Sequence, residues 1–203
     1  MNPRDLRHLI LKGILAWSVL SVLVWYFGDG MIKALFPLLK AVMSSLAPDF
    51  SHSLKLSDSV QSQLDASIEL SAWTLRPIYL NAKQFIPPGT DLKASTHLLH
   101  ILVPMVIEGS ILFVWPVQRW QQRGLLIILG LVSAVLVILA ILPMHLLAML
   151  EISLQDIALT ADKPRPEPWF IDWMVFCEMG GRWLLGVLAA WLCIQLQREL
   201  LPV

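Results

Sequence analysis

Charged residues and cysteines are scarce in this sequence. Asp, Glu, Lys and Arg make up 15% of its 203 residues, whereas a soluble domain carries about 25%. Basic and acidic residues number 15 each, so the formal net charge is zero and no overall basic field recruits nucleic acid. Two cysteines are too few for a disulfide-stapled scaffold. With 57% hydrophobic residues, the chain is neither disordered nor collagen-like, and its composition indicates a small integral membrane protein in contact with the lipid bilayer.

Catalytic and cofactor-binding motifs are missing as well. The sequence has no Walker loop, GxGxxG, GxSxG or HExxH segment and no paired CxxC. Cys177 and Cys193 are about 24 Å apart along one helix and cannot form a disulfide with each other. Cys177 lies next to Glu178, but no clear histidine partner activates it as a nucleophile. We therefore assign no catalytic residue, no metal ligand and no cofactor.

Four apolar runs predict four membrane-spanning helices, each of which needs about 20 mostly apolar residues. Three are long enough by themselves: Leu9 to Phe27, Leu98 to Val117 and Leu125 to Leu150. The last is longer than a crossing requires, so we expect it to tilt, to kink at Pro143 or to project its last turn into the headgroups. The fourth run, Trp183 to Gln197, is too short alone, so this crossing must begin near Trp169 and include Glu178 and Arg182.

Basic residues predict the orientation of these spans. With the N-terminus inside, the outer side holds eight basic and eleven acidic residues. The cytoplasmic side holds only two acidic residues, Asp5 and Glu199, against six basic ones: Arg4, Arg7, Lys12, Arg119, Arg123 and Arg198. The basic start and apolar run lack a small-x-small cleavage site, which favours an uncleaved signal-anchor. We expect a multi-pass protein of a bacterial inner membrane with both termini cytoplasmic.

The external segment, residues 28–96, begins with an expected amphipathic helix from Met31 to Ala47. Pro37 suits a first turn or a kink. This helix lies either on the outer membrane surface or against the protein's own spans.

From Leu54 the apolar period changes to two, which indicates strands over 54–60 and 64–70, with a turn at 57–59 or 61–63. A third stretch, Trp73 to Leu80, is interrupted by Pro77 and resembles an edge strand. Pro87-Pro88-Gly89 is expected to end the unit. A small antiparallel sheet of two or three strands follows from this pattern, and it needs support from the helix, the membrane or a partner. Trp73, Arg76 and Tyr79 are the partner-facing candidates.

The expected fold is thus a mainly α membrane protein, with four transmembrane helices and a small external α+β segment between the first two. Residues 1–27 form the cytoplasmic N-terminus and first span, and residues 28–96 the external segment. Residues 97–203 form three further spans, with a proline-rich external loop at 151–168.

Three charged residues lie where lipid is expected: Glu108, Glu178 and Arg182. A charge at the bilayer centre costs roughly 2.5–3.5 kcal/mol on the insertion scale, so these side chains should face protein or water. Glu178 and Arg182 are one helical turn apart, and Gly180 and Gly181 would let another helix approach. We expect a buried cluster of two acids and one arginine. It serves either as a polar clamp that fixes helix register or as a functional site, such as a proton path or a docking point for another membrane subunit.

His97 and His100 begin the second span at the outer headgroup level. A metal site there would need a third ligand, such as His52 or an acid, and nothing in the spacing demands one. Interfacial polar residues are the favoured interpretation.

The order of parts resembles the small accessory membrane proteins encoded with exosortases, the bacterial enzymes that process C-terminal sorting tails. The similarity rests on the strand-like segment Leu54–Leu80, which leads into Thr96-His97-Leu98-Leu99-His100 and the second span. It implies one N-terminal span, an external segment with short strands and a cluster of later spans. An exosortase itself needs Cys, Arg and His at the outer membrane face. Cys177, Arg182 and His145 are present, but two of them share one helix without a family signature, so no catalysis is transferred.

Two functions follow as hypotheses. The first is a non-catalytic accessory or structural subunit of a bacterial inner-membrane complex, which binds other membrane protein subunits through its external segment and helix faces. The alternative is a small membrane enzyme or proton-coupled transport component that uses Glu108, Glu178 and Arg182. Four spans without an inverted repeat argue against the alternative.

Overall fold

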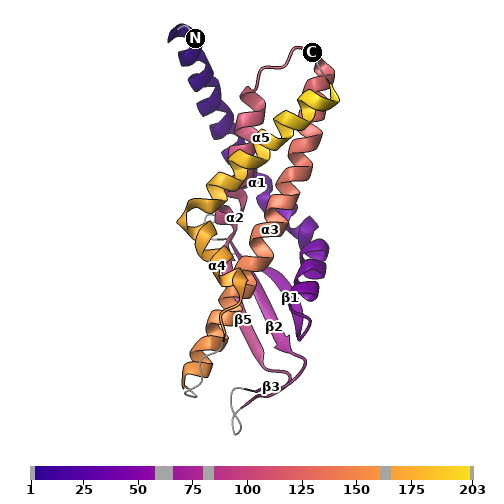
Figure 1. The fold of residues 1–203 in the computed structure, drawn as a ribbon, viewed down its shortest axis with the longest axis vertical. Helices are drawn as coiled ribbons and strands as arrows, with labels where there is room; N and C mark the ends of the chain where they lie inside the picture. The colour runs from indigo at the N-terminus through magenta and orange to yellow at the C-terminus, as the bar shows by residue number, and fades with distance from the viewer. Residues whose placement is uncertain (1–2, 58–65, 80–84, 161–165, 202–203) are drawn as a thin grey trace. The chain divides into compact units, whose positions relative to one another are not determined.

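The computed structural model of the chain describes residues 3–57, 66–79, 85–160 and 166–201 (Figure 1). Its helices are α1 (Pro3–Leu46), α2 (Leu98–Val114), α3 (Trp120–Thr160), α4 (Trp169–Phe176) and α5 (Arg182–Leu200), with a π-helical turn, η2 (Cys177–Gly181), between the last two. Its strands are β1 (Phe50–Ser57), β2 (Ser67–Thr74), β3 (Ile78–Tyr79), β4 (Phe85–Ile86) and β5 (Asp91–His97). Two compact units divide the chain. The first unit holds Met1–Gly28, Ile101–Ile138 and Gly180–Val203, and the second unit holds Asp29–His100 and Leu139–Met179.

Within the described residues, three helical stretches are long and apolar enough to cross a membrane: Arg7–Leu46, Trp120–Thr160 and Trp169–Leu200. Helix α2 is also apolar but has only 17 residues. The prediction of a mainly helical protein with membrane-compatible helices and a small sheet is therefore confirmed. The count of four spans stays a prediction.

Helix α1 corrects the expected break after the first span. The sequence predicted a span ending at Phe27 and a separate helix from Met31, but α1 runs unbroken from Pro3 to Leu46. Gly28 and Gly30 each weaken a helix by about 1 kcal/mol relative to alanine. Beyond them Ile32, Leu39 and Met43 are completely buried on one helical face. Their burial offsets the glycines, and Pro37 lies inside the helix rather than in a first turn.

Helix α3 corrects the expected external loop in the same way. The loop was predicted to begin at Glu151, yet the helix continues to Thr160. Leu150, Leu154 and Ala158 follow each other at a spacing of four and are all buried, so the buried stripe continues past the apolar run. Only residues 161–168 remain for the loop, and 161–165 lie outside the described residues.

The sheet of the second unit has the order β1-β2-β5, and both pairings are antiparallel. Strand β5 was missed, because Pro87-Pro88-Gly89 was taken as the end of the unit. These residues turn the chain instead, with Gly89 at φ 83°, where glycine meets no steric penalty. The expected third strand is divided: its first two residues end β2, and Ile78–Tyr79 form the short ladder β3-β4. The predicted turns fall almost wholly in residues 58–65, outside the described part.

Burial alternates along β2 and β5, as a half-covered sheet requires. Ile68, Leu70 and Ala72 on β2 lie on the inner face, beside Leu92 and Ala94 on β5. The outer face is polar and rich in serine: Ser51, Ser53, Lys55 and Ser57 on β1, Ser67, Glu69, Ser71 and Trp73 on β2, and Asp91, Lys93, Ser95 and His97 on β5.

In the first unit, α2, α3 and α5 share an apolar core that includes Leu112, Leu126 and Ile194. A close backbone approach lies at Gly186 of α5. A Cβ atom there would be 2.6 Å from the carbonyl oxygen of Pro104 in α2. The close approach expected at Gly180 is not found, since a Cβ atom at that residue meets nothing within 4 Å. Gly180 has a φ of 110° inside η2, so Glu178 and Arg182 do not share a regular α-helical turn.

The turn between α2 and α3 is held by Arg123, which the sequence assigned to the cytoplasmic side. Its guanidinium donates to the carbonyl oxygens of Leu112 (2.9 Å), Phe113 (3.1 Å) and Trp115 (3.0 Å). The last carbonyls of a helix have no partner within it. Arg123 therefore caps α2.

Candidate functional site

Four exposed side chains belong to the part of the chain where β2 leads into the β3-β4 ladder, and we treat them as one candidate site. We call Trp73, Arg76, Tyr79 and Phe85 the tip surface. Tyr79 is 73% exposed, Phe85 53% and Trp73 38%. The Tyr79 and Phe85 rings pair across the β3-β4 ladder, with their centroids 6.0 Å apart. Large aromatic side chains grouped outside a core are typical of interaction surfaces.

The three predicted partner-facing residues are all exposed, which partner contact requires. Arg76 lies 3.8 Å from the carboxylate of Asp49, and both side chains are mostly in water, so this ion pair adds little stability. Phe85 was missed by the sequence argument. Phe85 is an aromatic residue beyond Pro77 that could pair with Tyr79. The sequence alone does not show the register of this pairing.

The base of the tip surface is fixed by hydrogen bonds around Thr74. The Thr74 hydroxyl donates to the carbonyl oxygen of Pro87 (2.8 Å) and accepts from the backbone N–H of Thr90 (3.1 Å). The N–H of Gly89 donates to the carbonyl oxygen of Thr74 (2.7 Å). These hydrogen bonds join the end of β2 to the turn that precedes β5. They hold the base of the segment that carries the exposed aromatic side chains.

His52 lies on the inner face of the same sheet. His52 is 2% exposed, and neither ring nitrogen has a hydrogen-bond partner among the described residues. Burial lowers the pKa of His52 from its usual 6.5, and the nearby Lys40 ammonium lowers it further. His52 is therefore a neutral buried residue of the sheet. From the sequence, His52 was a possible third metal ligand beside His97 and His100. The rings of His97 and His100 lie edge to face, with centroids 5.6 Å apart, and the described residues contain no group of three or more ligands arranged for a metal.

Glu108 defines a second candidate site, in the first unit. Its carboxyl group is 1% exposed and is in hydrogen-bond contact through Oε1 with the hydroxyl of Ser133 in α3. Cys193 of α5 directs its Sγ toward both groups, 3.1 Å from Ser133 Oγ and 3.8 Å from Glu108 Oε1. We call Glu108, Ser133 and Cys193 the polar cluster. It joins three helices.

Glu178, the second acid expected within a span, lies beside a histidine. Glu178 Oε1 lies 3.6 Å from His145 Nδ1, within the second unit. Arg182 is buried in α5, as expected for a charge that avoids lipid. Whether Glu108, Glu178 and Arg182 form one cluster stays a prediction. Ser133 and His145 were missed as partners, although they are the only side chains in the run 125–150 with conventional hydrogen-bonding groups.

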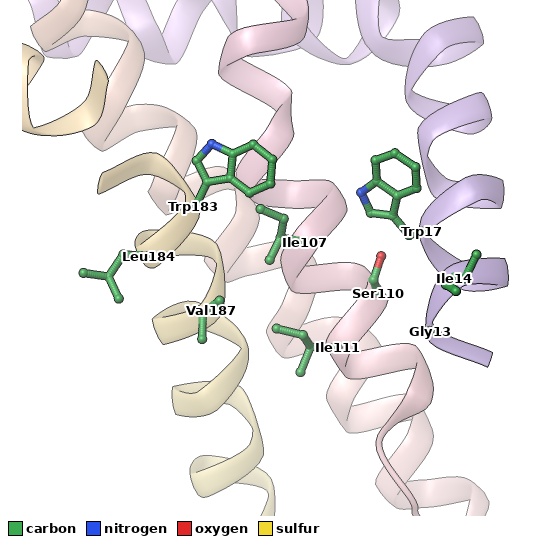
Figure 2. A pocket seen from close by; sticks show the side chains of 9 residues that line it. All are labelled: Gly13, Ile14, Trp17, Ile107, Ser110, Ile111, Trp183, Leu184 and Val187. Atoms are coloured by element: carbon green, nitrogen blue, oxygen red, sulfur yellow. The ribbon is translucent and has the colours of Figure 1, made fainter. Parts of the chain in front are cut away.

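An apolar groove of about 680 Å³ also lies in the first unit (Figure 2). Trp17 of α1 and Trp183 of α5 flank it, and Ile107 and Ile111 of α2 lie between them. The hydroxyl of Ser110 in the lining is already satisfied, because it donates to the carbonyl oxygen of Val106 (2.6 Å). The groove therefore offers mainly apolar contact.

No protein-family model, curated protein or solved structure matches this chain.

Proposed function

We propose that the chain is a non-catalytic accessory or structural subunit of a bacterial inner-membrane protein complex. Four spans hold it, with both termini in the cytoplasm, and it binds other membrane subunits through its external segment. Helix α2 serves as the second span, since 17 residues are the lower limit for a crossing. An even number of spans agrees with the basic residues that both termini carry.

The tip surface is the observation that carries this proposal. Tyr79 and Phe85 expose large apolar rings, although the neighbouring outer face of the sheet is polar. Aromatic residues and arginine are enriched at the centres of protein interfaces, where desolvating them contributes most to binding. A surface that only faced water would gain nothing from these rings. The resemblance to accessory membrane proteins stays a prediction and implies the same role.

Site-specific photo-crosslinking in native membranes tests the proposal. A photoreactive phenylalanine analogue replaces Tyr79, and in a matched control it replaces Lys55, which is exposed on the outer face of β1. We expect one discrete adduct with a membrane protein from position 79 and none from position 55. Substitution of Phe85 by alanine should weaken the adduct, since it removes the ring paired with position 79.

The proposal fails if position 79 gives no adduct, or if both positions give the same diffuse pattern. It also fails if the protein extracted gently from its membrane is a single component. Catalytic or transport activity of such a pure preparation would favour the rival hypothesis, a membrane enzyme or proton-coupled component that uses Glu108, Glu178 and Arg182.

A further inference from the structure

The two carboxyl oxygens of Glu108 have different surroundings. Oε1 contacts the Ser133 hydroxyl and lies near the Cys193 thiol. Oε2 is buried and has no hydrogen-bond partner in the part of the chain that the structure describes. Glu108 is also the only acidic side chain that is buried among the residues whose burial is described.

A charged carboxylate does not fit these surroundings. An ionised carboxylate in an apolar interior needs donors at both oxygens, or a cation, to replace its lost hydration. The contacts at Glu108 supply one hydroxyl and one thiol, both at Oε1, and a thiol is a weak donor. Nothing donates to Oε2, so an anion there would be left uncompensated.

A neutral carboxylic acid does fit them. The Ser133 hydroxyl has an acceptor of its own in the carbonyl oxygen of Gly130, 3.2 Å away. While Ser133 donates to Gly130, its lone pairs accept the acid proton of Glu108. The resulting chain runs from the carboxyl O–H to Ser133 Oγ and from Ser133 O–H to the carbonyl of Gly130. Oε2 is then a carbonyl oxygen without charge, which tolerates burial far better than an anionic oxygen.

We propose that the polar cluster is a proton-binding site, in which α2, α3 and α5 hold Glu108 as a carboxylic acid hydrogen-bonded to Ser133. The proton links α2 to α3, and Cys193 closes the cluster from α5. Removal of the proton leaves a buried anion between the three helices, so their packing depends on its presence. This site is separate from the tip surface, and its failure would leave the partner-binding proposal standing.

Infrared spectroscopy of the whole protein in lipid nanodiscs at neutral pH tests the site. The difference spectrum of wild type minus Glu108→Gln should show the C=O stretching band of a protonated carboxylic acid, and this band should shift in D₂O. Glutamine keeps the size and hydrogen-bonding capacity of the side chain, so the helices should stay packed. The control Glu69→Gln, on the exposed outer face of β2, should give no acid band in its difference spectrum.

A second variant tests the hydrogen bond and keeps the acid. In Ser133→Ala the band should persist and move to higher frequency, because the carboxyl O–H loses its acceptor. Two results overturn the proposal: a wild-type minus Glu108→Gln spectrum with carboxylate stretching bands and no acid band, or an acid band whose position Ser133→Ala leaves unchanged.

Discussion

His52 should make the stability of the external sheet depend on pH. The folded sheet buries the ring without a partner for either nitrogen, and burial and Lys40 hold its pKa below 6.5. In the unfolded segment the ring is in water and takes a proton near pH 6.5. Above that pH the ring is neutral in both states and contributes no pH dependence. Below it the unfolded segment binds one more proton than the folded one, so stability falls as the pH falls.

The size of the effect follows from the difference of one bound proton between the unfolded and the folded segment. The slope reaches about 1.4 kcal/mol per pH unit between pH 6.5 and the lowered pKa of the folded state. His52→Leu should remove this slope. The same substitution should stabilise the sheet by about 1–3 kcal/mol, because it removes two buried polar nitrogens that lack partners and replaces the ring with an apolar side chain of similar volume.

Hydrogen exchange read by mass spectrometry measures the effect on peptides from β1 and β2. Opening free energies are compared between about pH 7.5 and pH 5 after correction for intrinsic exchange. His97→Gln is the matched control, since His97 is exposed on the outer face of β5, and it should keep the wild-type slope. A wild-type sheet whose opening free energy does not change with pH would refute the reasoning. So would an equal slope in His52→Leu.

The remaining predictions concern the first unit and are read from unfolding in detergent, followed by circular dichroism. Gly186→Ala should destabilise by about 1–3 kcal/mol, because its Cβ would meet backbone atoms of Pro104 at 2.6 and 3.1 Å. Gly13→Ala meets nothing within 4 Å and should be neutral or stabilising by up to about 1 kcal/mol; equal effects of the two would contradict the close approach. Arg123→Ala should cost about 1.5–3 kcal/mol, because three carbonyls lose their donor. Arg123→Lys should recover only part of this, since an ammonium lacks the planar fork, and full recovery would exclude the capping role.

Periodicity predicted the sheet but not its full extent. The alternation is strong in β1 and β2 because inner positions there are leucine and isoleucine: Leu54 and Leu56 in β1, Ile68 and Leu70 in β2. In β5 the inner positions are Leu92, Ala94 and Thr96, which carry a weak apolar signal. Their burial comes from pairing with β2, which local sequence does not show.

Helix lengths were underestimated for a related reason. The apolar runs end at Phe27 and Leu150, and they predict helix ends there. Both helices continue, and on one face of each a stripe of buried apolar residues continues with them. A span and the amphipathic helix after it differ in composition but share one backbone, so the change in composition marks a change in surroundings and not a helix end.

The polar residues of α3 indicate which side chains contact the two acids, and the predictions from sequence did not use them. The run 125–150 has two side chains with conventional hydrogen-bonding groups, and each contacts one of the two acids expected within the spans: Ser133 meets Glu108, and His145 meets Glu178. Lipid supplies neither donors nor acceptors, so a polar side chain in a span is driven toward another polar side chain. Listing the polar side chains within every expected span therefore gives the candidate partners of the two acids from sequence. Assigning which acid meets which partner requires the helix faces, and these follow from close approaches such as that of Gly186 to Pro104.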